Sequence, residues 1–304
     1  MKPDINSKIR VAVVGYGNVG RSAAQAIMAA PDMELCGIVR TTLAPSKLPE
    51  FPSVPVVGTI WELDKVDVAI LCSPSRNIKD SAIPILEKGI STVDSYDIHD
   101  DIFELKCALD KAAKQGNACA VISSGWDPGS NSVIRALLEA CAPKGITYTN
   151  FGPGMSMGHT VAVKAISGVE NAMSATIPLG TGIHRRMVYI QLAPGAKFEE
   201  VAAAIKADPY FVNNETHVIQ VDDVNDYIDV GHGVNLERRG ASGSASNQSF
   251  QFSMRINNPA LTSQVMVSCA RAALRQAPGA YTMIELPVVD LLPGDREAAI
   301  RRLV

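Results

Sequence analysis

The chain has 304 residues, of which 47% are hydrophobic and 19% charged, and its 28 Lys and Arg against 31 Asp and Glu give a formal net charge of −3. This composition excludes a disordered or fibrous chain and argues against nucleic acid or an anionic membrane as the main partner. No run approaches the roughly 18 apolar residues of a membrane span, and the polar stretch 1–8 lacks the apolar core of a secretory signal, so we expect a cytoplasmic protein.

Short apolar, β-branched runs alternate with helical patterns in the first part of the chain. The runs are residues 9–14, 34–39, 66–72, 91–93 and 118–122, and the helical patterns are residues 22–30, 77–88 and 101–115. The first strand, helix and second strand fit within about thirty residues, the usual length of a βαβ unit. We therefore predict an α/β fold of Rossmann type, in which helices cover both faces of a doubly wound parallel sheet.

The pattern changes after Gly125, where glycine-rich turns separate segments of alternating polarity. Residues 186–192 and 216–221 are typical of antiparallel strands, and a helical pattern at 198–207 lies between them, so we predict a second domain of α+β type. The small residues at 240–246 predict a mobile loop. The helix-like stretch 263–276 could belong to either domain, and we expect the chain to return to the first. The predicted division is 1–123 for the dinucleotide-binding domain, 124–259 for the second domain and 260–304 for the returning C-terminal segment.

A glycine motif follows the first predicted strand. Gly15-Tyr16-Gly17-Asn18-Val19-Gly20 has the G-x-G-x-x-G spacing and opens a helix, which is the context that this motif requires. Without side chains at the three glycines the turn can be tight, and a pyrophosphate can approach backbone N–H groups at the start of the helix. The motif predicts a bound dinucleotide, with Asn18 and Val19 among the residues that contact it.

The end of the second predicted strand indicates which dinucleotide is bound. Sites selective for NAD usually place a carboxylate about 20 residues after the motif, but here the strand ends in Val39-Arg40-Thr41. A carboxylate would repel a 2′-phosphate, whereas Arg40 can bind one through charge-assisted hydrogen bonds. Arg40 and Thr41 therefore favour NADP, although Arg40 could also be an ordinary solvated side chain.

Three polar segments follow later strands of the predicted sheet. They are Cys72-Ser73-Pro74-Ser75, Asp94-Ser95-Tyr96-Asp97 and Ser123-Ser124-Gly125-Trp126-Asp127-Pro128-Gly129. Ligands of doubly wound sheets bind beyond the carboxyl ends of the strands. We therefore expect the first segment to contact the cofactor, and two carboxylates and an indole to converge near the nicotinamide.

The cysteine and histidine residues do not form a metal-binding pattern. No two of the six cysteines have C-x-x-C spacing, and the five histidines lack the spacing of metal ligands, so we predict reduced core thiols and no metal site.

Five segments of the chain occur in a distinctive order. They are Val13-Val14-Gly15-Tyr16-Gly17-Asn18-Val19-Gly20, Asp94-Ser95-Tyr96-Asp97-Ile98-His99, Ser124-Gly125-Trp126-Asp127-Pro128-Gly129, Gly152-Pro153-Gly154-Met155-Ser156-Met157-Gly158-His159 and Asn257-Asn258-Pro259. Together they resemble the meso-diaminopimelate D-dehydrogenase family. The first is common among nucleotide enzymes, and the other four in this order are specific. The resemblance implies NADP-dependent, reversible oxidative deamination of the D-centre of meso-2,6-diaminopimelate on the lysine pathway, a substrate and dimerisation domain after the Rossmann domain, and a homodimer.

The resemblance also implies a role for individual residues. Asp97 and Asp127 match acidic residues beside the reacting D-centre. Trp126 and Phe151 match walls of that pocket, and Met157 and Gly158 match the turn that receives the reacting carboxylate. The groups that grip the distal L-centre are matched by Thr176, Arg186, His232 and Asn258. The short segment between Pro178 and Arg186, with Phe and Met where longer members have Trp and Gln, is similar to a compact branch that also aminates other 2-keto acids to D-amino acids.

Other interpretations stay open on the residues alone. Asp beside Trp and Pro also caps turns, Arg185-Arg186 would ordinarily be a solvated pair, and His232 between glycines fits a polar loop. The proton acceptor could be Asp97, Asp127 or water held by either. Two other functions remain, a reductase of the dihydrodipicolinate reductase type and a non-catalytic NADP sensor, and the first is disfavoured because the chain has no paired-histidine motif followed by lysine.

Overall fold

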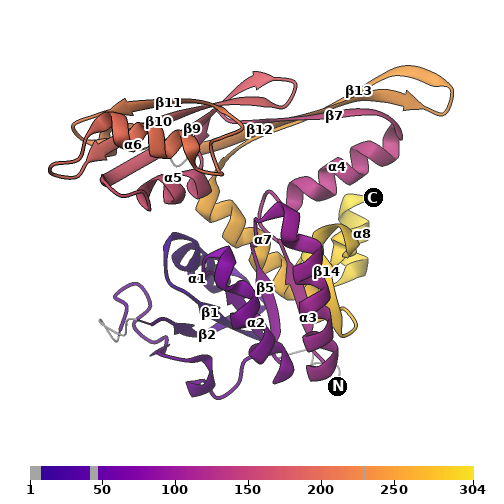
Figure 1. Cartoon of the computed structure of the whole chain (residues 1–304). Coiled ribbons are helices and arrows are strands. Elements are labelled where there is room, and N and C mark those ends of the chain that lie inside the picture. The colour runs from indigo at the N-terminus through magenta and orange to yellow at the C-terminus, as the bar shows by residue number, and fades with distance from the viewer. Residues whose placement is uncertain (1–7, 42–46, 229–230) are drawn as a thin grey trace. The chain divides into compact units, whose positions relative to one another are not determined.

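The computed structural model describes residues 8–41, 47–228 and 231–304, and these separate into two units (Figure 1). The first unit contains the described residues up to Val133 together with Pro259–Val304, and the second is Ile134–Asn258. The sequence predicts the first boundary between 123 and 124, ahead of its place in the structure. The turn after residue 123 instead stays with the first unit, because Ser124 is fully buried and donates hydrogen bonds to the main chain of Asp94. Most of the polar stretch 1–8 lies outside the described residues.

The first unit is built on a seven-stranded sheet whose strands are all parallel. In spatial order the strands are β3 (Val56–Val57), β2 (Met33–Val39), β1 (Ile9–Val14), β4 (Val68–Leu71), β5 (Ser91–Asp94), β6 (Cys119–Ile122) and β14 (Gly279–Thr282). The order reverses between β1 and β4, the point at which doubly wound sheets bind ligands. The predicted Rossmann-type fold is confirmed.

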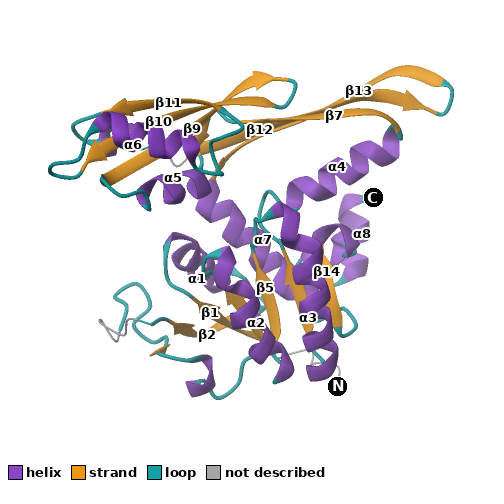
Figure 2. Cartoon of the chain, in the orientation of Figure 1, coloured by secondary structure: helices purple, strands orange, loops and turns teal. Residues whose placement is uncertain are grey.

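Helices pack on both faces of this sheet (Figure 2). Successive side chains of a strand point to opposite faces, so Val11 and Val13 join the core beneath two helices, whereas Ala12 joins the core on the other side. The helices of the first core are α1 (Asn18–Ala29) and α7 (Asn258–Ala273), and those of the second are α2 (Ile78–Glu87) and α3 (Ile102–Gly116).

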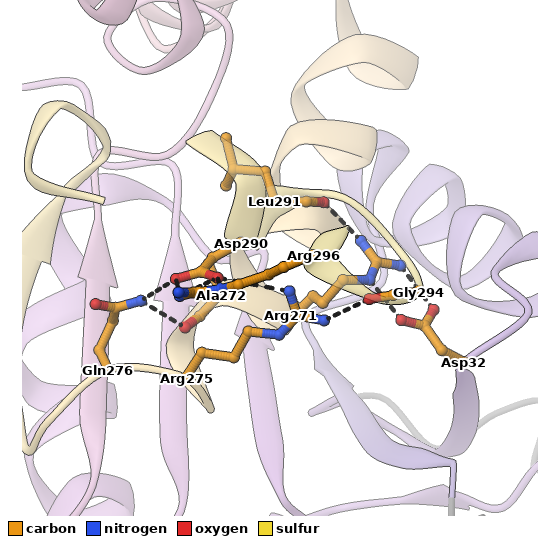
Figure 3. Close-up of polar contacts among 9 residues, drawn as sticks. All are labelled: Asp32, Arg271, Ala272, Arg275, Gln276, Asp290, Leu291, Gly294 and Arg296. Atoms are coloured by element: carbon orange, nitrogen blue, oxygen red, sulfur yellow. Dashed lines mark hydrogen bonds and ion pairs between the residues drawn. The ribbon is translucent and has the colours of Figure 1, made fainter. Parts of the chain in front are cut away.

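Strand pairing and ion pairs join the C-terminal segment to the rest of the first unit. β14 pairs with β6, and α8 (Arg296–Leu303) follows. Arg271 of α7 makes a bidentate pair with Asp32, at 2.5 and 2.7 Å, in the turn before β2 (Figure 3). Nearby, the fully buried carboxylate of Asp290 accepts hydrogen bonds from Arg296 and from Gln276. Charge-assisted, bidentate contacts of this kind are among the stronger polar interactions in proteins.

The second unit contains two sheets. One has the order β11 (Glu215–Gln220), β10 (Ile183–Leu192), β9 (Val169–Gly180) and β8 (Gly154–Met155), and the other has the order β13 (Ala245–Asn257), β12 (Gly231–Ser242) and β7 (Lys144–Phe151). Val163 of α5 (Met157–Lys164) and Ile205 of α6 (Phe198–Ala207) form a core with Val188 and Ile190 of β10. A further helix, α4 (Ser130–Cys141), runs across the boundary between the units in sequence.

Two predictions for this unit are wrong. β11 pairs with β10 in parallel, not antiparallel, because α6 carries the chain back along the sheet before β11 begins. The predicted mobile loop at 240–246 is instead the tip of the β12–β13 hairpin, where Ser242 pairs with Ala245 and Gly243 adopts a φ of 60°. Small residues here satisfy the turn geometry of a tight hairpin.

Candidate active site

The first and third glycines of the motif lie where no larger residue could fit. Gly15 has a φ of 96°, and a Cβ on it would lie 2.9 Å from the carbonyl oxygen of Cys72. A Cβ on Gly20 would lie 2.0 Å from the carbonyl oxygen of Gly15. Gly17 precedes α1 and has open space at the Cβ position. The turn therefore leaves backbone N–H groups and the positive end of α1 free of side-chain cover, as a dinucleotide pyrophosphate requires.

Arg40 lies beside this turn. It is half-buried at the end of β2, and its backbone N–H donates to Val57 at 3.0 Å. A cavity of about 520 Å³ is lined by Tyr16, Gly17, Asn18, Arg21, Arg40, Leu48, Pro49 and Glu50. The structure therefore brings Arg40 together with the predicted motif residues Gly17 and Asn18. Thr41 follows Arg40 and is exposed.

The segment after β4 lies against the glycine turn. The N–H of Cys72 donates to Val14 at 2.7 Å, which holds the carboxyl ends of β1 and β4 side by side. Ser73 Oγ is buried and has no hydrogen-bond partner among the described residues. A hydroxyl left unsatisfied in this way is costly unless a ligand supplies the partner. The open glycine turn, Arg40 and Ser73 together fit a phosphorylated dinucleotide.

The two predicted acidic residues are each held by a neighbouring side chain. Ser75 Oγ donates to Asp97 Oδ1 at 2.6 Å, so the segment that ends β4 also orients Asp97. Asn131 of α4 donates to Asp127 Oδ2 at 3.3 Å. Asp97 is exposed and Asp127 half-buried, so both can reach a ligand.

Trp126 and Asp127 lie on a closed turn that leads into α4. The carbonyl of Trp126 accepts hydrogen bonds from Asn131 N at 2.9 Å and from Ser130 Oγ at 3.2 Å, and its indole is 7% exposed. Gly129 has a φ of 137°, and a Cβ there would lie 1.8 Å from the carbonyl oxygen of Gly125. The turn therefore depends on glycine at this position, and it holds Trp126 in one place.

In the second unit, Arg186 is the prominent cation among the predicted residues. It lies on β10 opposite Thr176 of β9, to whose hydroxyl its Nη1 donates a short hydrogen bond. Arg186 Nε is buried and has no hydrogen-bond partner among the described residues. Burial lowers the pKa of Arg186 to about 10, so the guanidinium stays charged at neutral pH. Arg186 is thus equipped to bind a carboxylate.

The other predicted residues of this unit lie on strands and helix starts. Met157 and Gly158 begin α5, and Asn258 begins α7. The N–H of Phe151 donates to His184 Nε2 at 2.8 Å, and the two rings are 5.5 Å apart. His232 contradicts its expected place in a polar loop: it lies on β12 and is only 6% exposed, because the glycines beside it belong to a strand.

Comparisons with known proteins agree with this description. Residues 9–123 match a family model of oxidoreductases with an NAD-binding Rossmann fold, and residues 125–183 match the diaminopimelic acid dehydrogenase C-terminal domain. A meso-diaminopimelate D-dehydrogenase from Bacteroides fragilis is 62% identical over 297 residues, which cover 98% of this chain and 99% of that protein. The chain belongs to the meso-diaminopimelate D-dehydrogenase family. It is therefore an oxidoreductase with a nicotinamide-dinucleotide-binding domain, and the predicted resemblance is confirmed.

Solved structures of family members have the same fold. The C. glutamicum DAP dehydrogenase in complex with DAP is 31% identical, with a TM-score of 0.89 over 98% of this chain and 100% of that one. An engineered D-amino acid dehydrogenase bound to NADP+ is 30% identical, with a TM-score of 0.85 over the same shares of the two chains.

Sequence reasoning missed the residues that hold the predicted ones in place. Asn131, His184 and Glu50 each contact a predicted residue or line its cavity, yet no motif marks them. All six cysteines are free, but Cys107 and Cys141 are exposed, so the prediction of core thiols is wrong for these two, which lie on the outer faces of α3 and α4. In the described part of the chain no cluster of His, Cys, Asp and Glu could hold a metal ion, and no helix has the length and apolarity to cross a bilayer.

Proposed function

We propose that this protein catalyses the NADP-dependent, reversible oxidative deamination of the D-centre of meso-2,6-diaminopimelate, releasing ammonia and L-2-amino-6-oxopimelate. The observation that carries the proposal is the 62% identity to a meso-diaminopimelate D-dehydrogenase over 98% of this chain. A relative in complex with DAP and another bound to NADP+ support the substrate and the cofactor. The cyclised product would enter lysine biosynthesis as tetrahydrodipicolinate.

NADP is favoured over NAD by the charge at the end of β2. Arg40 lines the cavity beside Gly17 and Asn18, where the adenosine end of a dinucleotide lies in this fold, and a guanidinium there suits a 2′-phosphate. The cofactor contacts in this proposal come from Gly15, Gly17, Asn18, Val19, Gly20, Arg40, Thr41, Cys72, Ser73, Pro74 and Ser75. Bound NADP supplies the hydride acceptor, and the protein supplies orientation and charge.

Asp97 and Asp127 hold the reacting amine in this proposal. Oxidation of the D-centre requires a neutral amine and a fixed Cα–H, so two acceptors beside the amine can both orient it and receive its proton. The family resemblance assigns Trp126 and Phe151 to the residues around this amine. Water then adds to the imine carbon and ammonia leaves.

The carboxylates of the substrate are assigned to the second unit. Met157 and Gly158 begin α5, and N–H groups at a helix start attract an anion such as the reacting carboxylate. Arg186, paired with Thr176, binds the distal carboxylate, and His232 and Asn258 complete the grip on the L-centre. We also propose a cytoplasmic homodimer, and a substrate range that extends to other 2-keto acids, which would be aminated to D-amino acids.

A substrate panel with the purified protein tests the proposal. NADPH formation should require meso-diaminopimelate and should be slower with the L,L isomer and with D-alanine. NADPH oxidation with tetrahydrodipicolinate should require ammonia. Turnover of tetrahydrodipicolinate without ammonia would instead indicate a dihydrodipicolinate reductase, and tight NADPH binding with no turnover of any amine would indicate a sensor.

A further inference from the structure

Asp94, the last residue of β5, is an acidic side chain that the proposed chemistry does not use. It is 0% exposed, and its Oδ1 accepts hydrogen bonds from the backbone N–H groups of Tyr96 and Ser123, both at 3.0 Å. Its Oδ2 is buried and has no hydrogen-bond partner among the described residues. Carboxylates are almost never fully buried unless they are paired, so this one needs an explanation.

The groups that Asp94 contacts belong to two different loops. Tyr96 lies in the loop that continues to Asp97. Ser123 begins the turn that continues to Trp126 and Asp127, and it adopts a φ of 51°, a conformation that is unusual for serine. The carbonyl oxygen of Asp94 also accepts from Ser124 N at 2.8 Å and from Ser124 Oγ at 2.6 Å. Asp94 therefore joins the loop of one proposed acid to the turn of the other.

The cost of burying the Asp94 carboxyl group is offset by hydrogen bonds from the backbone of the two loops. Burial raises the pKa of Asp94 to about 6, and the N–H groups of Tyr96 and Ser123 oppose that rise. These two donors are thus the interactions that offset the cost of burying the carboxyl group. A side chain without an acceptor at this position would leave the N–H groups of Tyr96 and Ser123 buried and unsatisfied. Because that is costly, both loops would shift toward backbone conformations in which these N–H groups find other acceptors.

We propose that Asp94 is a positioning residue that fixes the separation of Asp97 and Asp127 by bonding the main chain of both loops. This inference rests on the proposed function, because it concerns the placing of two residues to which that function assigns the amine. A displacement of about 1 Å in a reacting geometry can lower a rate about a hundredfold. Asp94 therefore acts on turnover without touching the substrate.

The test compares two substitutions of Asp94 with a control on the same strand. Asp94→Ala removes the acceptor, and it should lower kcat about 10- to 100-fold while the Kd for NADPH changes less than about twofold. Asp94→Asn keeps an oxygen acceptor at the same place, and it should restore kcat to within about threefold of the wild type. Thr92→Val is the matched control, because Thr92 is also fully buried on β5 and its Oγ1 has no hydrogen-bond partner among the described residues.

Rates are normalised to the number of NADPH-binding sites measured by fluorescence titration, so a loss of folded protein does not count as a loss of kcat. Wild-type kcat in Asp94→Ala, or equal losses in Asp94→Ala and Thr92→Val, would overturn the positioning role. If Asp94→Ala binds no NADPH, Asp94→Asn decides the question, because it keeps an oxygen acceptor for the N–H groups of Tyr96 and Ser123. Its kcat should stay within about threefold of the wild type, and a fall of about tenfold or more would overturn the proposal.

The two proposals fail in different ways. A wild-type protein that cannot oxidise meso-diaminopimelate with NADP refutes the proposed function, and with it the role of Asp94. An active wild type whose Asp94→Ala variant turns over at the full rate refutes the positioning role alone.

Discussion

The ion pair between Arg271 and Asp32 should respond very differently to the loss of each partner. The side chain of Arg271 is 4% exposed, whereas that of Asp32 is 29% exposed. Asp32→Ala leaves a buried guanidinium that still donates to the carbonyl of Leu291 at 2.9 Å but has lost its carboxylate. Arg271→Met leaves a carboxylate that water can reach, and the apolar stem of the side chain is largely retained.

These exposures set the expected magnitudes. An uncompensated buried charge costs about 3–5 kcal/mol, and a domain of this size loses about 2–4 °C of thermal midpoint per kcal/mol, so Asp32→Ala should lower the midpoint by about 6–20 °C. Arg271→Met should cost less than half of that. The double variant should be more stable than Asp32→Ala alone, because it no longer buries the cation.

Thermal unfolding of the three variants measures these differences, with the pair Arg301–Glu297 as the control. That pair is equally short, at 2.6 Å, but its side chains are 77% and 70% exposed, so Glu297→Ala should scarcely change the midpoint. A larger loss in Arg271→Met than in Asp32→Ala would refute the reasoning.

The hydrogen bond from Arg271 is the main cause that lowers the pKa of Asp32. The stability that this pair contributes is therefore present above about pH 3.8 and is lost as the pH falls further.

Three more predictions concern the cofactor, the substrate and pH. Arg40→Asp should weaken NADPH binding far more than NADH binding in fluorescence titrations, and equal losses would remove Arg40 from the 2′-phosphate site. Arg186→Ala should raise KM for meso-diaminopimelate about a hundredfold but leave KM for D-alanine nearly unchanged, because D-alanine has no distal carboxylate; comparable losses would contradict the assignment. Burial, followed by the charge of Arg186, lowers the pKa of His159 from 6.5 to about 3, so folding favours the neutral ring. Stability should therefore fall by about 1 kcal/mol per pH unit as the pH drops from 6.5 toward 3, and urea unfolding of His159→Gln should lack most of this slope.

The sequence predicts well those parts of the fold that depend on residues close together in the chain. The first strand and the helix at 198–207 have the predicted bounds, because each is a run of one periodicity between turn residues. The glycine motif could be interpreted as a binding turn because the backbone itself requires glycine there, as the 2.0 Å approach at Gly20 illustrates. The Ser75–Asp97 hydrogen bond could have been inferred from the sequence, because both residues follow strands that are adjacent in a doubly wound sheet.

Contacts between residues far apart in sequence could not be predicted in the same way. The parallel pairing of β11 depends on where α6 returns the chain, and the burial of His232 depends on β12 being a strand at all. Asn131 belongs to no motif, and Asp94 lies in a segment that the sequence marks without showing what Asp94 contacts; only the fold brings them to Asp127 and to the two loops. Their roles therefore become visible only when the structure provides their partners.

The position of Arg186 shows how much of the proposed site depends on strand register. Arg186 pairs with Thr176 across β9 and β10, and the register of this pair shifts between Ile183 and His184, next to the turn that joins the two strands. A slip of one residue would move every side chain of β10 to the opposite face of the sheet. Arg186 has the same parity as Val188 and Ile190, which form a core with Val163 of α5 and Ile205 of α6. The burial of Val188 and Ile190 therefore fixes the register of β10, and with it the face that carries the guanidinium.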